Sequence, residues 1–205
     1  MNEHVLIPRQ ETEILVEEVM RHLHDGMRIL DMCTGSGCIL ISLIHYSNRC
    51  SGVGVDLSEA ALEVAWDNAK RLLRTRGEKS EAVTETGTVT FKKGNLFEDV
   101  EGKFEIIVSN PPYIESEVIG TLMPEVRLHE PVMALDGGED GLDFYRQIVR
   151  DGREHLSGGG MLFFEIGHNQ GEAVKTLLEQ NGFIGVEIVQ DYAGLDRVVY
   201  GTCQR

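Results

Sequence analysis

The chain has 205 residues, of which 41% are hydrophobic and 26% charged, as expected for one globular domain with a sizeable core. Its formal net charge of −15 argues against broad contact with a nucleic-acid backbone, because such contact requires clustered Lys and Arg. We find no run of about 18 apolar residues and no basic, apolar leader, so neither a transmembrane helix nor a secretory signal is expected.

In chain order, the patterns predict helix 11–23, strand 27–33, helix 38–47, strand 51–56, helix 58–73, an exposed loop over 75–88, strands 89–93 and 104–108, an irregular segment over 115–142, helix 142–156, strand 158–166, helix 169–182, and strands 184–190 and 196–202. Strands that alternate with helices and are apolar on both faces predict an α/β fold with a mostly parallel seven-stranded sheet covered by helices on both faces. The short loop between the last two strands predicts an antiparallel edge hairpin. Ligands of such sheets bind beyond the carboxyl ends of the strands.

The four cysteines, at positions 33, 38, 50 and 203, include no C-x-x-C pair, and the histidines are scattered. We therefore expect reduced thiols in a cytoplasmic protein, and no metal.

A glycine-containing loop, DMCTGSGC (31–38), joins the first strand to the next helix. Gly35 and Gly37 allow a tight turn and close backbone approach to a ligand, but Leu40 stands where the dinucleotide pattern requires a third glycine. Asp56 ends the second strand, where a carboxylate can accept hydrogen bonds from both hydroxyls of a ribose. This combination suits a nucleoside without phosphates, such as S-adenosylmethionine (SAM). A plain turn with a solvated acid is the alternative.

Two further residues follow the third main strand, in the stretch GNLFED (94–99). Asn95 is a candidate polar contact for an adenine and Leu96 a candidate apolar cover. A turn asparagine is an equally good interpretation of Asn95 taken alone.

The stretch VSNPPYI (108–114) ends an apolar strand with two prolines. Neither proline has an N–H to give a β-ladder, so the strand must end here. What remains is the Asn110 side-chain oxygen and rigid carbonyls, which make a pocket rich in acceptors and suited to an NH2 group. Tyr113 adds a flat face on which a planar group can stack.

Several segments together resemble the peptide chain release factor glutamine methyltransferases. They are VLIPRQETE (5–13), SNPPYI (109–114), EPVMALDGGEDGLDFYRQI (130–148) and GLDRVV (194–199). The resemblance implies a Rossmann-like SAM-dependent methyltransferase domain over 1–205, with 1–25 as lead-in segment and helix and without the family's N-terminal helical domain. The family usually has Gly where this chain has Cys33.

The resemblance also implies roles for individual residues. The cofactor SAM would be held by Cys33, Thr34, Gly35, Ser36, Gly37, Asp56, Asn95, Leu96 and Asn110. The substrate glutamine amide would be held by Asn110, Pro111, Pro112 and Tyr113, with Asn110, Pro111 and Tyr113 taking part in catalysis.

The activity implied by the resemblance is methyl transfer to the glutamine of the Gly-Gly-Gln motif of a release factor, which is the expected protein partner. An adenine amino-methyltransferase acting on DNA or RNA is the alternative, since the same pocket fits an exocyclic amine, but the net charge of −15 counts against nucleic-acid binding. A module that binds SAM without turnover is the third possibility.

Overall fold

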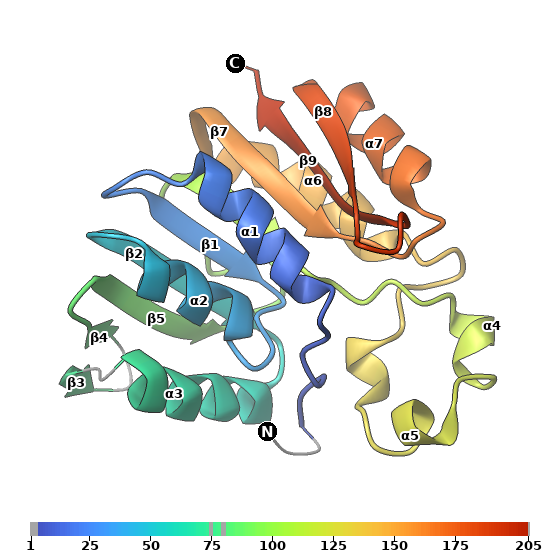
Figure 1. Ribbon diagram of the computed structural model, residues 1–205, viewed down its shortest axis with the longest axis horizontal. Helices are drawn as coiled ribbons and strands as arrows, with labels where there is room; N and C mark the ends of the chain where they lie inside the picture. The colour runs from blue at the N-terminus through green and yellow to red at the C-terminus, as the bar shows by residue number, and fades with distance from the viewer. Residues whose placement is uncertain (1–3, 74–75, 79–80, 205) are drawn as a thin grey trace.

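The computed structural model describes residues 4–73, 76–78 and 81–204, in which nine strands form one sheet with the order β3-β4-β5-β2-β1-β6-β7-β9-β8 (Figure 1). The strands are β1 (Arg28–Met32), β2 (Cys50–Asp56), β3 (Arg76–Glu78), β4 (Glu81–Val83), β5 (Gly87–Lys93), β6 (Phe104–Ser109), β7 (Leu156–Glu165), β8 (Phe183–Gln190) and β9 (Asp196–Cys203). The helices are α1 (Thr12–His22), α2 (Cys38–Tyr46), α3 (Glu59–Leu73), α4 (Ser116–Ile119), α5 (Pro124–Arg127), the 3₁₀ helix η1 (Val132–Ala134), α6 (Asp143–His155) and α7 (Gly171–Gln180).

The predicted seven-stranded sheet is confirmed as the central part of this sheet. Strands β5, β2, β1, β6 and β7 are parallel neighbours, and β9 runs antiparallel between β7 and β8 at the edge. The Ser58 hydroxyl caps the helix after β2, since it accepts a hydrogen bond from the Ala61 amide at 3.2 Å.

Two predictions about connecting segments were wrong. The expected loop over 75–88 contains β3, β4 and the start of β5, and β4 pairs antiparallel with β5; residues 75, 79 and 80 lie outside the described part. Edge strands expose one side to water, so a polar sequence does not exclude them. The segment 115–142, expected to be irregular, contains α4, α5 and η1, which are single turns too short to show a helical period.

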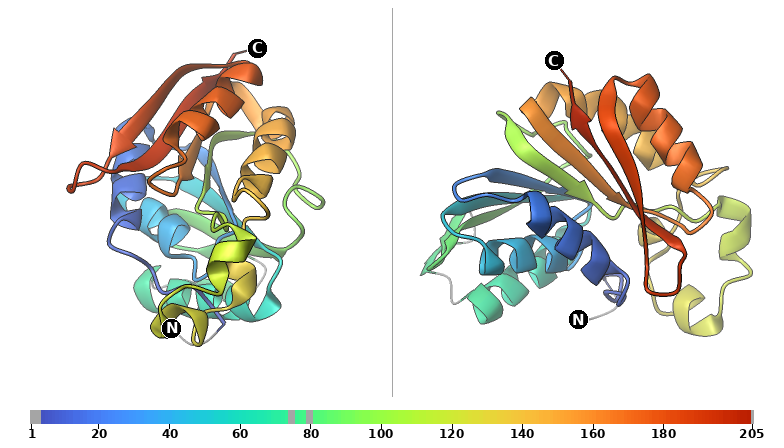
Figure 2. Two further views of the ribbon diagram at one scale, coloured as in Figure 1. Left: turned by 90° about the vertical axis from the view of Figure 1, so that its right-hand side faces the viewer. Right: turned by 45° about the horizontal axis from the view of Figure 1, so that its top comes forward.

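The central strands contribute to two apolar cores, one on each face of the sheet. Alternate residues of a strand point to opposite faces, so Phe163 of β7 belongs to the core covered by α1, α2 and α3, while Leu162 and Phe164 belong to the core covered by α6 and α7. Figures 1 and 2 show these two helical layers. The sheet is therefore held rigidly from both sides.

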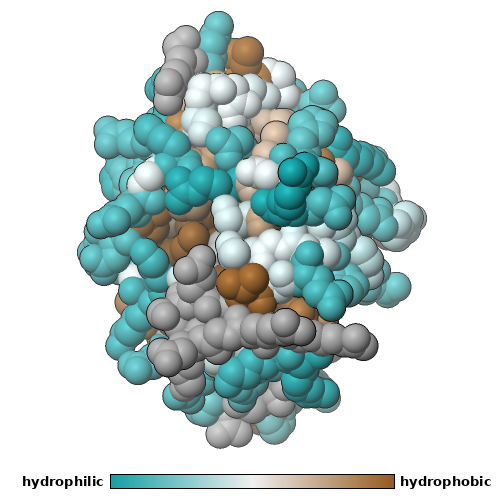
Figure 3. All heavy atoms as spheres, turned by 90° about the vertical axis from the view of Figure 1, so that its left-hand side faces the viewer, coloured by the Kyte–Doolittle hydropathy of each residue, from teal (hydrophilic) through white to brown (hydrophobic). Residues whose placement is uncertain are grey.

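On the face of the molecule shown in Figure 3, hydrophilic side chains lie mainly around the rim, and residues of intermediate and hydrophobic character lie nearer the centre. None of the helices within residues 4–73, 76–78 and 81–204 combines the length and hydropathy needed to cross a bilayer.

Replacing Leu40 in α2 by alanine should lower the free energy of unfolding by about 2–5 kcal/mol, because the side chain is fully buried against the sheet. A Cβ built on Gly52 of β2 would lie 2.6 Å from Leu40 Cδ1, so helix and strand are in close contact here. Leu72→Ala is the matched control, since Leu72 is 63% exposed and should change the stability by about 0.5 kcal/mol or less. Urea titration followed by circular dichroism measures both; equal losses would contradict this account of the core.

Candidate active site

A cavity of about 1030 Å³, counted with its open mouth, lies at the carboxyl ends of β1, β2, β5 and β6. Its place follows from the strand order. The chain continues from β1 to β2 on one side and returns to β6 on the other, and parallel sheets open a crevice where the order reverses in this way. The Ser109 hydroxyl donates to the Met32 carbonyl at 2.7 Å and ties the ends of β6 and β1 together at this crevice.

Most of the residues predicted to form the site line this cavity. They are Cys33, Thr34, Gly35, Ser36, Asp56, Asn95, Leu96, Asn110 and Pro112. The structure thus brings together four segments that lie far apart in the sequence. Gly37, Pro111 and Tyr113 are not among the lining residues, and their contacts with ligand stay predictions.

The glycine loop turns tightly between β1 and α2. Cys33, Gly35 and Gly37 all have positive φ, at 60°, 54° and 75°. A side chain on Gly35 would meet nothing closer than 4.0 Å, whereas one on Gly37 would lie 3.1 Å from both Ala65 and Ile41. Gly35 therefore leaves the loop open towards the cavity, and Gly37 allows the start of α2 to pack closely on its neighbours.

Asp56 connects the glycine loop to the end of β2. Its carboxylate accepts hydrogen bonds from the Gly35 amide at 2.8 Å and from the Ser58 amide at 2.9 Å, one on each oxygen. A carboxylate oxygen can accept more than one hydrogen bond, so both keep capacity for a pair of ligand hydroxyls. Burial raises the pKa of Asp56, against these backbone hydrogen bonds, which lower it.

Asp31 lies beneath the loop in β1 and is completely buried. One of its oxygens accepts a hydrogen bond from the Thr34 hydroxyl at 2.6 Å, and the other has no partner among the described residues. Burial raises the pKa of this carboxyl to about 7. The sequence marked Asp31 only as the end of a strand.

Asn95 and Leu96 follow β5 on the far side of Asp56. Leu96 is buried with a positive φ of 52°, and Asn95 is exposed, its amide donating to Glu98 at 3.2 Å. The Gly94 amide donates to the Asp56 carbonyl at 3.1 Å and fixes this turn against the end of β2. Both residues line the cavity, and their contact with an adenine stays a prediction.

The Asn110–Tyr113 turn forms the opposite wall. Pro111 and Pro112 are buried, and Asn110 is half-buried beside Glu165 at the end of β7. Burial raises the pKa of the Glu165 carboxyl, while the nearby polar side chain of Thr12, the positive charge of Arg197 and the side chain of Asn110 lower it. Burial also raises the pKa of Tyr113, to about 12, so its hydroxyl stays neutral at ordinary pH.

Two parts of the wall were missed by the sequence analysis. The N-terminal segment contributes His4, Val5, Leu6 and Pro8, and the segment around η1 contributes Pro131, Met133 and Ala134. The ion pair between Arg9 and Glu130, at 2.6 Å, joins these two segments. Both overlap segments that carry the family resemblance, 5–13 and 130–148, but no residue pattern in them indicates a place at the cavity, which depends on the path of the whole chain. Phe144 of α6, which packs against the core, also lines the cavity.

The chemistry of the lining fits a nucleoside that carries no phosphates. Among the described residues that line the cavity none is Lys or Arg, while Asp56 offers acceptors and the remaining surface is largely apolar. No group of three or more His, Cys, Asp or Glu side chains in the described part of the chain could hold a metal ion. All four cysteines are free thiols.

Comparisons with known proteins identify the family. The model of the Methyltransferase small domain matches residues 10–126, more than half of the chain. The release factor glutamine methyltransferases of Thermodesulfovibrio yellowstonii and Geobacter sulfurreducens are 40% and 42% identical, over 95% and 96% of this chain and 67% and 65% of their own length. The chain thus spans about two thirds of these relatives.

A comparison with solved structures indicates the same family. The protein-(glutamine-N5) methyltransferase (release factor-specific) of Alicyclobacillus acidocaldarius superposes with a TM-score of 0.55 at 30% identity, covering 97% of this chain and 95% of that one. The chain belongs to the release factor glutamine methyltransferase family, whose cofactor is S-adenosylmethionine.

Proposed function

We propose that this chain transfers a methyl group from SAM to the side-chain amide nitrogen of the glutamine in the Gly-Gly-Gln motif of a peptide chain release factor. The observation that carries the proposal is the position of the Asn110–Tyr113 turn. It lies on the same cavity as the glycine loop and Asp56, so a cofactor pocket and an acceptor-rich turn face one space. A release factor acts in translation, and we place the enzyme with it in the cytoplasm.

In this proposal Cys33–Gly37 and Asp56 hold SAM, with Asn95 and Leu96 beside its adenine. When bound, SAM supplies an electrophilic methyl group on a sulfonium. The fit is supported by the Asp56 carboxylate, which keeps acceptor capacity for the ribose after binding Gly35 and Ser58. It is supported also by a lining without Lys or Arg, which favours a cofactor that has no phosphates.

The turn determines what the acceptor substrate can be. Pro111 and Pro112 lack N–H groups, so the turn presents oxygens without competing donors. The two hydrogens of a glutamine amide would be accepted by Asn110 Oδ1 and a proline carbonyl, while Tyr113 stacks on the amide plane. Such bonds orient the nitrogen lone pair away from the turn and towards the cofactor pocket.

The same dipoles stabilise the transition state. An amide nitrogen is a weak nucleophile because its lone pair is delocalised, and positive charge develops on it as the new N–C bond forms. Asn110 Oδ1 and the proline carbonyl are already oriented towards that charge. One proton then leaves the nitrogen to water, so no strong base is needed beforehand.

The proposal is tested by methyl transfer from labelled SAM to a purified release factor. We expect label on the intact factor and none on the same factor with its Gly-Gly-Gln glutamine changed to alanine. Label on duplex DNA would instead identify an adenine amino-methyltransferase. Binding of SAM without label on any acceptor would identify a binding module and overturn the proposal.

Replacing Asp56 by asparagine should weaken SAM binding by about tenfold or more, because an amide has one acceptor oxygen and cannot serve Gly35, Ser58 and the ribose together. Asp67→Asn is the control with the same change in charge, since the Asp67 side chain is 76% exposed on α3. Isothermal titration calorimetry measures both affinities. Equal affinities for the two variants would exclude Asp56 from the cofactor site.

Replacing Asn110 by alanine should lower kcat about 10²-fold or more, because the amide nitrogen loses the acceptor that orients it and stabilises its charge. Asn48→Ala serves as control, since Asn48 is exposed next to the start of β2, at the opposite end of this strand from the cavity. Rates are measured at saturating SAM. A kcat of Asn110→Ala within threefold of the control would remove Asn110 from the reaction.

A further inference from the structure

Gln170 is a buried glutamine that makes three hydrogen bonds near the Asn110–Tyr113 turn. It lies between β7 and α7 and is 7% exposed. Its Nε2 donates to the carbonyl of Tyr113 at 3.0 Å and to that of Gly141 at 3.2 Å, and its Oε1 accepts from the Gly167 amide at 2.9 Å. One side chain thus connects three separate segments behind the cavity.

The chemistry of these three bonds requires an amide. Two carbonyl oxygens face Nε2 and one N–H faces Oε1, which fixes the orientation of the Gln170 amide. A carboxylate would keep the bond from Gly167 but place an oxygen against two carbonyls. An apolar side chain would leave all three backbone groups buried without this partner.

The second of these segments, the glycine-rich loop 136–141, packs directly on the turn. The Gly137 amide donates to the Ile114 carbonyl at 2.8 Å, and the Ile114 amide donates to Leu135 at 2.9 Å. A Cβ on Gly141 would lie 2.4 Å from the Tyr113 oxygen, and one on Gly137 would lie 2.7 Å from the Tyr113 Cα. Only glycine allows this approach, so the loop supports the turn along its backbone.

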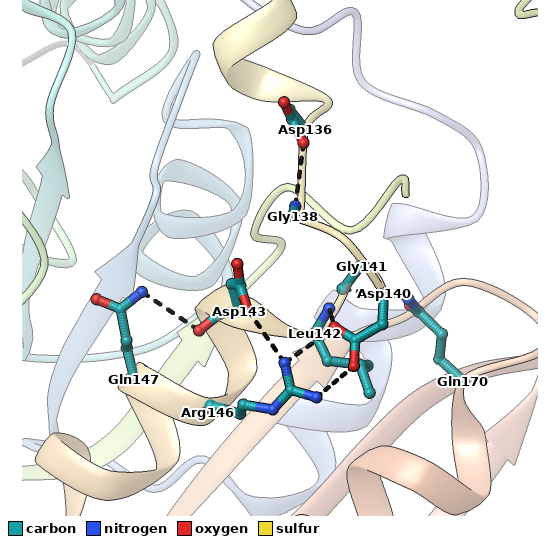
Figure 4. Close-up of polar contacts among 9 residues, drawn as sticks. All are labelled: Asp136, Gly138, Asp140, Gly141, Leu142, Asp143, Arg146, Gln147 and Gln170. Carbon is teal, nitrogen blue, oxygen red and sulfur yellow. Dashed lines mark hydrogen bonds and ion pairs between the residues drawn. The ribbon is translucent and has the colours of Figure 1, made fainter. Parts of the chain in front are cut away.

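The outer side of the same loop is fixed by Arg146 of α6. Its guanidinium donates to both carboxylate oxygens of Asp140, at 2.9 Å to Oδ1, and also to Asp143 at 3.0 Å. Figure 4 shows this ion-pair cluster on one side of Gly141 and Gln170 on the other. The loop is therefore held between an exposed charged group and the buried amide.

We propose that Gln170 is a positioning residue for methyl transfer. It fixes the Tyr113 carbonyl, and through it the Asn110–Tyr113 turn, in the geometry that presents acceptor oxygens to the substrate amide. This inference rests on the proposed function for its effect on the reaction. The hold on the turn itself can be measured without any substrate.

The test uses Gln170→Glu, which keeps the size of the side chain and the Gly167 bond but removes both donors. Hydrogen–deuterium exchange of the unliganded protein should be about tenfold faster at the amides of Ile114 and Gly137. With a release factor and SAM, kcat should fall about 10²-fold, with KM for the factor within threefold of its original value. The Kd for SAM should stay within threefold, because Gln170 does not line the cavity.

Two control variants separate positioning from general loss of stability. Gln147→Glu makes the same chemical change in α6, where Gln147 is half-buried and donates to the Asp143 carbonyl at 3.3 Å; it should alter neither exchange nor kcat (Figure 4). Val174→Ala removes buried volume from α7 one turn beyond Gln170 and should lower the melting temperature while leaving kcat within threefold.

A second variant approaches the same contact from the opposite side. Gly141→Ala places a methyl group against the Tyr113 carbonyl and Gln170, and it should reproduce the faster exchange and the lower kcat. Exchange unchanged in Gln170→Glu, or a kcat no lower than that of Val174→Ala, would overturn the inference. If Gln170→Glu exchanges faster but the unsubstituted protein transfers no methyl group, Gln170 does fix the turn, and it is the proposed function that is wrong.

Discussion

The two prolines at the end of β6 constrain everything around the cavity. β6 is a central strand with parallel neighbours on both sides, so a residue without an N–H cannot continue its ladder. The chain must leave the sheet after Ser109, at the point where the strand order reverses and a crevice opens. The two prolines that end the strand therefore also leave carbonyl oxygens at the crevice without N–H donors beside them. The same two prolines thus explain both the end of β6 and the acceptor oxygens that the proposed reaction uses.

A turn rich in acceptors is useful only if its geometry is fixed, and the last residue that the sheet pairs is Ser109, just before the turn. The remaining support comes from loops: the Ile114 amide and carbonyl bind the segment 135–137, and Gln170 binds the Tyr113 carbonyl. Glycines at 137 and 141 are required because side chains there would collide with the turn. The glycine-rich sequence after η1 is thus explained by contact with the turn, in addition to the freedom that glycine gives to a loop.

Much of the fold and the candidate site could be predicted from the sequence, because the signals were local. Apolar strands buried on both faces have a recognisable pattern, and Asp56 and Asn110 stand at strand ends that a parallel sheet brings together. The rest depended on the path of the chain. Nothing local indicates that residues 4–8 and the segment around η1 close the cavity, or that polar residues near 76–83 add strands at an edge. The positive φ of Cys33 and Leu96 was equally hidden, since side chains rarely adopt it.

The positive charge of the proposed cofactor would affect the two acids near the cavity, Asp31 and Asp56. Asp31 is buried and Asp56 half-buried, and the charge of Asp56 raises the pKa of Asp31 further; desolvation by burial is the largest cause of the raised pKa in both. Without a ligand, this arrangement disfavours two negative charges. In the proposed function, the sulfonium cation of SAM bound in this cavity would offset that cost, because an opposite charge favours the ionised carboxylates and lowers their pKa values. The same burial that is unfavourable in the free protein therefore strengthens the preference for a cation. An anionic nucleotide would meet the opposite effect, since its phosphates would add to the negative charge already present.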